Sequence, residues 1–302
     1  MKLMAVFSLC ASIVLAVVAF VPPTLANQDD VRGAFLVSRP KDQPKSTGQA
    51  ARPSRRRPKA KTTSTETKNT GTPTEGTTVP TTAKTNEKST PVNTPRIGIG
   101  LTLFMRDSNG HSVRTDPSHV FQKGDRLRVL VETNADGYLY IFNTTNNGPA
   151  LMLYPNTELD EAGNYLQAHV PFEIPSSLAA EERLRWFTFD ENAGEERIFF
   201  VFSREPLSGV PMEDDLINLC RDTRNACPWR PGAEVWEAIQ KERAQPLKTD
   251  KAKRFGAAQT AREQQATSRG LGLAKDDPEP SLIMMASSSS PTLVTTLDLI
   301  HK

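Results

Sequence analysis

A two-residue alternation of apolar and other side chains begins at Ile97, and it constrains the fold of this chain more than any other feature. Ile97, Ile99, Leu101, Leu103 and Met105 occupy every second position of one run. A β-strand points successive side chains to opposite faces, so a run of this kind predicts a half-buried strand. We therefore place the start of the folded domain, residues 97–302, at this point.

Further strand-like runs follow, separated by residues that favour turns. They cover residues 126–133, 138–142, 150–154, 185–189 and 198–203. The Asp136-Gly137 pair is the strongest short signal for a hairpin turn. Strands that recur roughly every 8–15 residues with turns between them predict a mainly β fold, either an antiparallel β-sandwich or a barrel-like domain, with one or two short helices.

The last residues of the chain alternate in the same way. Leu293, Leu297 and Leu299 share one face of the run 292–301, which is rich in leucine and β-branched residues. A mobile tail is normally polar, so we expect this run to be an integral closing strand. Because the strand Ile97–Met105 opens the domain, we predict that the closing strand pairs with it in antiparallel orientation.

The amino-terminal residues have the order of a secretory signal peptide. Lys2 precedes the apolar run 3–21, and small residues lead to a cleavage site after Ala26. This predicts a signal peptide at 1–26, a short segment at 27–37 and an exported protein, periplasmic or extracellular. A membrane anchor is the alternative, because the apolar run is near the lower length limit for a span. We expect cleavage, and no stable transmembrane anchor afterwards.

Residues 38–96 are rich in Pro, Thr, Ser, Lys and Arg and contain almost no large apolar side chain. They hold 13 basic and 4 acidic residues, a net charge of +9, whereas the residues after Arg96 hold 22 basic and 29 acidic residues, a net charge of −7. This composition predicts a disordered basic linker joined to an acidic domain. Export argues against nucleic acid as its partner. A solvated spacer and a contact with anionic wall polymer or lipid headgroups both remain open.

The carboxyl-terminal third changes character. Residues 213–220 and 233–244 have helical patterns, which together predict a helical insertion at 211–246. Residues 248–280 are polar, and we expect a mobile excursion there. Residues 282–286 have the pattern of a short strand.

Two cysteines, Cys220 and Cys227, remain after the predicted cleavage site. An even pair in an exported chain favours a disulfide. A metal site is the alternative, but no histidine lies nearby in the sequence.

Aromatic side chains gather on two neighbouring strands. Tyr138, Tyr140 and Phe142 alternate on one face, and Tyr154 lies on the following strand. A packed aromatic core is one interpretation. The other is an exposed face that binds a glycan or a peptide.

No motif with established chemistry accompanies these features. The four histidines, His111, His119, His169 and His301, share no metal-ligand spacing, and no nucleophile motif stands out. The sequence therefore predicts no catalytic residue, no metal and no cofactor.

Five ordered segments carry a family resemblance: VFQKGDRL (120–127), DGYLYI (136–141), LYPN (153–156), IP (174–175) and GEERI (194–198). Together they resemble the bacterial "domain of unknown function 4384" family over about residues 118–206. The resemblance implies an exported β module and no catalytic residues.

Two functions of different classes are consistent with these observations. One is a non-catalytic binding or scaffolding module of the cell envelope, which contacts an envelope protein or a glycan or anionic wall polymer through the linker or the aromatic face. The other is an envelope hydrolase whose carboxylates come together only in the fold.

Overall fold

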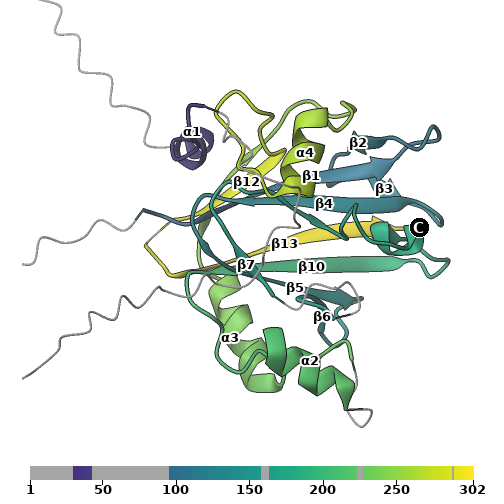
Figure 1. The fold of residues 1–302 in the computed structure, drawn as a ribbon. Coiled ribbons are helices and arrows are strands. Elements are labelled where there is room, and N and C mark those ends of the chain that lie inside the picture. The colour runs from purple at the N-terminus through teal and green to yellow at the C-terminus, as the bar shows by residue number, and fades with distance from the viewer. Residues whose placement is uncertain (1–29, 43–94, 158–162, 223–226, 288) are drawn as a thin grey trace, which may run out of the picture. The chain divides into compact units, whose positions relative to one another are not determined.

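The computed structural model describes residues 30–42, 95–157, 163–222, 227–287 and 289–302 (Figure 1). Residues Val31–Lys302 form one unit, which is mainly β and contains two packed sheets. The predicted mainly β fold is thereby confirmed, and of its two predicted forms the described residues adopt the sandwich. The predicted signal peptide, 1–26, and residues 43–94 of the predicted linker lie outside the described residues. In the described ranges no helix is long and apolar enough to cross a membrane.

The first sheet is antiparallel throughout. Within the described ranges its strand order is β11 (Leu247–Lys251), β12 (Leu282–Ala286), β1 (Gly98–Arg106), β4 (Arg126–Thr133) and β8 (Phe172–Ile174), with β2 (Ser112–Arg114) beside β1 and β9 (Phe187–Thr188) beside β4. A short 3₁₀-helix, Glu182–Arg185, precedes β9. The predicted strand at 282–286 is confirmed as β12.

The second sheet contains the longest strands. Its order in the described part of the chain is β3 (Val120–Phe121), β13 (Thr292–His301), β10 (Gly194–Ser203), β5 (Gly137–Thr145) and β6 (Leu151–Tyr154), with β7 (Tyr165–Leu166) beside β5. The pairs are antiparallel except β3–β13, which is parallel.

The closing strand is integral, as predicted, but its predicted partner is wrong. β13 pairs with β10 from Ser203↔Thr292 to Gly194↔His301, in the second sheet. β1 lies in the first sheet, between β12 and β4. Alternation shows that a strand has one buried face, but both sheets face the same core. The pattern therefore could not determine which sheet β13 would join.

The main core lies between the two sheets. Its buried side chains come from the inward faces of both, including Leu101 and Val129 from the first sheet and Ile141, Phe200 and Leu297 from the second. Each such side chain contributes roughly 1.5–3 kcal/mol when it is removed from water. This core follows directly from the two-residue alternation in the sequence.

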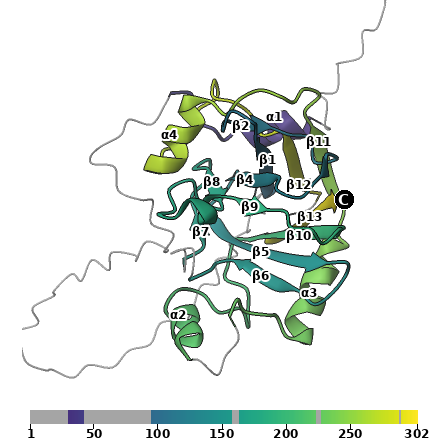
Figure 2. The same cartoon turned by 90° about the vertical axis from the view of Figure 1, so that its right-hand side faces the viewer.

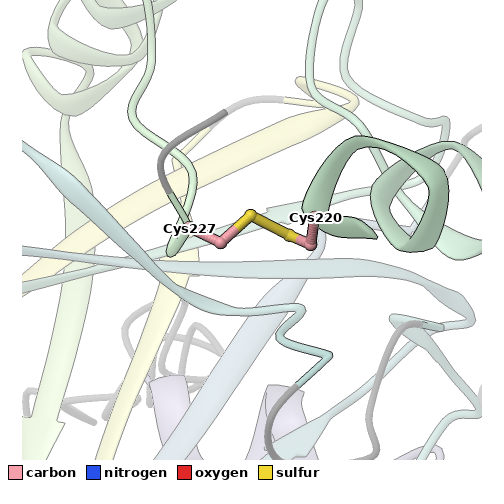
Figure 3. The surroundings of a disulfide bond; sticks show 2 residues. All are labelled: Cys220 and Cys227. Atoms are coloured by element: carbon pink, nitrogen blue, oxygen red, sulfur yellow. A yellow bond between two sulfur atoms is a disulfide. The ribbon is translucent and has the colours of Figure 1, made fainter. Parts of the chain in front are cut away.

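Two helices cover the outer face of the second sheet (Figures 1 and 2). α2 (Glu213–Arg221) and α3 (Ala233–Arg243) confirm the predicted helical insertion. Leu216 of α2 and Ile239 of α3 are buried against the sheet. Cys220 and Cys227 form the predicted disulfide, with a Cα–Cα distance of 5.7 Å, and it links the end of α2 to the chain that leads to α3 (Figure 3).

The outer face of the first sheet is covered by chain that the sequence did not predict to be ordered. Residues 248–280, expected to be a mobile excursion, include most of β11 and the helix α4 (Ala261–Arg269). A capping box between Thr260 and Glu263 begins α4, and Gly270 ends it in the left-handed conformation, with φ of 63°. The expectation is wrong because the polar residues here form buried hydrogen bonds and ion pairs.

Residues 31–42, which we call the docking segment, also pack on the first sheet. They include the short helix α1 (Val31–Leu36), and Phe35 is fully buried beside β1 and β12. A Cβ atom on Gly98 would lie 2.9 Å from the Phe35 ring, and one on Gly100 would lie 3.2 Å from it. These glycines of β1 therefore make room for Phe35.

The docking segment corrects two predicted boundaries. The predicted linker began at Ser38, but Arg39 is buried in the domain. The domain itself was predicted to begin at Ile97, although α1 belongs to the same unit. The described part of the domain therefore includes residues on both sides of the range 43–94.

Candidate functional site

Three core-facing rows of the second sheet end in polar residues at the same end of the sandwich. On β5 the inward row is Leu139, Ile141 and then Asn143. On β10 it runs from Phe200 through Ile198 to Glu196, and on β13 from Leu297 through Leu299 to His301. The register pairs Ile198 with Asn143 and Glu196 with Leu299, so the polar ends are neighbours.

These ends line a pocket of about 220 Å³ between the two sheets. Apolar side chains from both sheets form most of its wall, and the other lining side chains are polar or charged. The lining residues are Leu127, Asn143, Leu153, Phe187, Thr188, Phe189, Asp190, Glu196, Ile198, Leu299 and His301. An apolar cavity with a few converging polar groups is the usual form of a small-ligand site.

Asn143 is the polar group whose bonding is incomplete. Its amide nitrogen donates to Glu196 Oε2 at 2.7 Å, and the Thr145 hydroxyl donates to the same oxygen at 2.9 Å. Asn143 Oδ1 is buried and has no hydrogen-bond partner among the described residues. A buried acceptor without a donor destabilises a fold by roughly 1–3 kcal/mol. A ligand N–H or O–H group would remove that penalty.

The remaining polar groups give the pocket an acidic rim. His301 is buried, and its ring packs against that of Phe189 with 5.2 Å between centroids. Hydrogen bonds from the Asn192 backbone and side chain lower the pKa of Asp190. Asp190 is therefore ionised at neutral pH, so the rim favours a donor or a cation over an anion. Within the described ranges no group of three or more His, Cys, Asp or Glu side chains could hold a metal ion.

The aromatic residues predicted as a possible binding face are core residues. Tyr138, Tyr140 and Phe142 are buried beneath α2 and α3, with Trp236 of α3 in edge contact with Phe142 at 5.9 Å. Tyr154 is buried in the main core, on the opposite face of the sheet. The interpretation as an exposed aromatic face is therefore wrong. The helical insertion covers this face, which the strand pattern alone could not show.

The residues that do line the pocket were not selected from the sequence. In each of the three rows, every second residue is apolar until a polar residue takes the next position. These polar residues are Asn143, Glu196 and His301. That break is visible in the sequence. It gains meaning only when β13 is known to lie beside β10, because this placement brings the ends of the rows together.

Fold and pocket together define a two-sheet β domain with a side-chain-sized pocket at one end. The model of the family described as "Domain of unknown function (DUF4384)" matches residues 120–206, which confirms the resemblance in that part of the chain. Most of the pocket-lining residues lie inside the match, whereas Leu299 and His301 of β13 lie outside it. No curated protein and no solved structure matches the chain.

Proposed function

We propose that the chain is an exported binding module of the cell envelope, and that its inter-sheet pocket, which is non-catalytic, holds an apolar group carrying an N–H donor or a positive charge. The observation that carries the proposal is that Asn143, which lines the pocket, has a buried Oδ1 atom without a hydrogen-bond partner among the described residues. A bound donor would complete its hydrogen bonding.

The size of the pocket limits the ligand. Sites for drug-sized molecules usually enclose about 300–1,000 Å³. At about 220 Å³ this pocket suits a single side chain or the end of a chain rather than a whole small molecule. A side chain or an amino terminus presented by a peptide or protein partner fits this volume.

The charges of the pocket favour the same class of ligand. Glu196 and Asp190 both line it, and the residues after Arg96 have a net charge of −7. An anionic polymer would be repelled here. The basic linker is better suited to such a polymer, because residues 38–96 have a net charge of +9.

Two features support the envelope as the location. The Cys220–Cys227 disulfide is typical of oxidising compartments. The amino-terminal residues have the order of a signal peptide.

Phenethylamine and phenylacetate test the proposal, because they share an apolar ring and differ in the sign of their charge. We expect the amine to shift the backbone NMR resonances of Asn143, Leu153 and His301 at millimolar concentration, and the acid to leave them unchanged. Glu196→Gln should weaken amine binding roughly tenfold, which corresponds to about 1.4 kcal/mol.

The matched control is Glu237→Gln, because Glu237 is exposed on α3, outside the pocket. This variant should bind the amine like the unchanged protein. Equal binding of amine and acid, or shifts confined to residues away from the pocket, would contradict the proposal.

A further inference from the structure

A hydrogen-bonded row of three side chains lies where the docking segment meets the first sheet. Ser38 Oγ is 2.7 Å from His169 Nε2, and His169 Nδ1 is 2.7 Å from Glu132 Oε1. Ser38 is exposed, whereas His169 and Glu132 are each 2% exposed. An exposed hydroxyl, a buried imidazole and a buried carboxylate in this order are the parts of an activated serine nucleophile.

The carboxylate determines which ring nitrogen of His169 carries the proton. Arg39 donates to both oxygens of Glu132, at 2.8 and 2.7 Å, which favours the ionised carboxylate. An ionised carboxylate only accepts hydrogen bonds, so His169 Nδ1 must donate to it. In the neutral ring Nε2 then carries a lone pair that accepts from the Ser38 hydroxyl. The Phe35 carbonyl, at 3.4 Å, is a more distant acceptor for that hydroxyl.

The backbone of His169 adopts an uncommon conformation. Its φ is 58°, in the left-handed region that residues other than glycine rarely occupy, although histidine does so more often than most. Its N–H donates to the Thr133 carbonyl at 2.7 Å, and its own carbonyl accepts from the Leu273 N–H at 2.8 Å. Strained residues that are held from both sides occur often at functional sites.

We propose that Ser38 is a nucleophile that His169 activates as general base, with Glu132 as the positioning residue, and that it accepts acyl groups from esters. Ser38 Oγ forms a bond to the ester carbonyl carbon and gives its proton to His169 Nε2. The imidazole passes that proton to the leaving alkoxide as its C–O bond breaks. Water then releases the acid by the same sequence and regenerates the hydroxyl.

Esters are the substrate class that this row of side chains suits, because their alkoxides leave more readily than the nitrogen leaving groups of amides. This activity lies outside the proposed binding function, and its residues are absent from the lining of the inter-sheet pocket.

A fluorophosphonate probe with a fluorescent tag, applied to the full mature chain, tests the proposal. It should label the folded protein, and mass spectrometry should map the adduct to Ser38. Ser38→Ala should abolish labelling, whereas Ser208→Ala, at an exposed serine outside the row, should not change it. His169→Gln should slow labelling roughly 100-fold or more.

A conservative variant distinguishes the positioning role of Glu132 from a merely structural one. Glu132 accepts from His169 Nδ1 and is paired with Arg39. The amide of Glu132→Gln can donate to Nδ1 and so favour the wrong ring tautomer, and this variant should slow labelling of the folded protein roughly tenfold or more. Glu132→Asp keeps the carboxylate and should recover part of the rate. An unlabelled folded wild-type protein, or an adduct on another serine, would overturn the proposal.

Discussion

The two outer faces of the sandwich are covered by opposite chemistry. On the second sheet, α2 and α3 cover an aromatic surface with apolar side chains such as Leu216 and Ile239. On the first sheet, the docking segment and the chain around α4 cover β1 and β4 largely with ion pairs and hydrogen bonds. One domain thus attaches its two covers by different forces, which should respond differently to mutation and to pH.

The docking segment and the chain around α4, which we call the ionic cover, contain several buried charged groups. Arg39 uses all five of its N–H donors: two on Glu132, and three on the carbonyls of Ala274, Asp277 and Pro278. Elsewhere on this face Arg114 pairs with Glu263, and Arg262 pairs with Asp277. Breaking a buried pair leaves an uncompensated charge, which destabilises a protein more than the pair itself stabilises it. The ionic cover should therefore be intolerant of single substitutions.

Removal of the docking segment should have the largest effect. A chain that begins at Gln43 loses the buried Phe35, worth roughly 2–3 kcal/mol, and all five hydrogen bonds of Arg39, worth roughly 1 kcal/mol or more each. We expect the free energy of unfolding in urea to fall by about 5 kcal/mol or more. A chain that begins at Val31 is the control and should unfold at the original midpoint. Equal midpoints for the two chains would show that the segment does not dock.

A substitution in α2 or α3, which form the apolar cover, should reduce the free energy of unfolding less than removal of the docking segment does. The reduction should also be insensitive to pH. Ile239→Ala removes a side chain that is 3% exposed on α3, so we expect a loss of about 2–4 kcal/mol. The loss should be equal at about pH 5 and about pH 8, because none of the buried residues of this cluster titrates in that range. Urea unfolding at both values measures it. A loss that varies with pH would mean that charged groups also support this cover.

The smallest effect is expected at the edge of the ionic cover, where Lys251 of β11 contacts Asp116 at 2.7 Å. Partial burial raises the pKa of Asp116, but hydrogen bonds from Lys251 and Ser118 outweigh it and lower the pKa to about 2. A lowered carboxyl pKa stabilises the fold above the unfolded value near 4, and this contribution is lost as the pH falls through about 2.

Asp116→Asn should accordingly cost less than about 1 kcal/mol at neutral pH, because the pair is partly exposed to solvent. The difference between the two proteins in urea unfolding should shrink between about pH 4 and about pH 2. A difference that stays constant over this range would show that the Asp116 carboxylate is not the source.

These two covers also explain which parts of the structure the sequence could predict. The strands, α2, α3 and the disulfide follow from apolar spacing, turn residues and cysteine count, which are local properties. The partner of β13 and the burial of Tyr138 depend on contacts between distant segments, so the partner was predicted wrongly and the burial was left open. The ionic cover was missed for a different reason. Arg39 and Glu263 are charged, and charged residues are almost always exposed unless they are paired. Their partners lie far away in the chain, so the sequence alone does not show that these two residues are buried.

The same limit applies to the candidate sites. The pocket residues Asn143, Glu196 and His301 are brought together only by the strand order of the second sheet. Ser38, Glu132 and His169 meet because the docking segment folds back onto the first sheet. Neither arrangement has a sequence motif, because its members lie on separate elements at unrelated spacings.

The Arg39–Glu132 pair offers the most direct test of an ionic cover. A double-mutant cycle compares Arg39→Met, Glu132→Gln and the double variant by urea unfolding. We expect each single change to lower the free energy of unfolding by about 3–5 kcal/mol. The double variant should lose at least about 2 kcal/mol less than the sum of the two single losses, because it leaves no unpaired buried charge. Strictly additive losses would contradict the account, since they would mean that Arg39 and Glu132 stabilise the domain independently of each other.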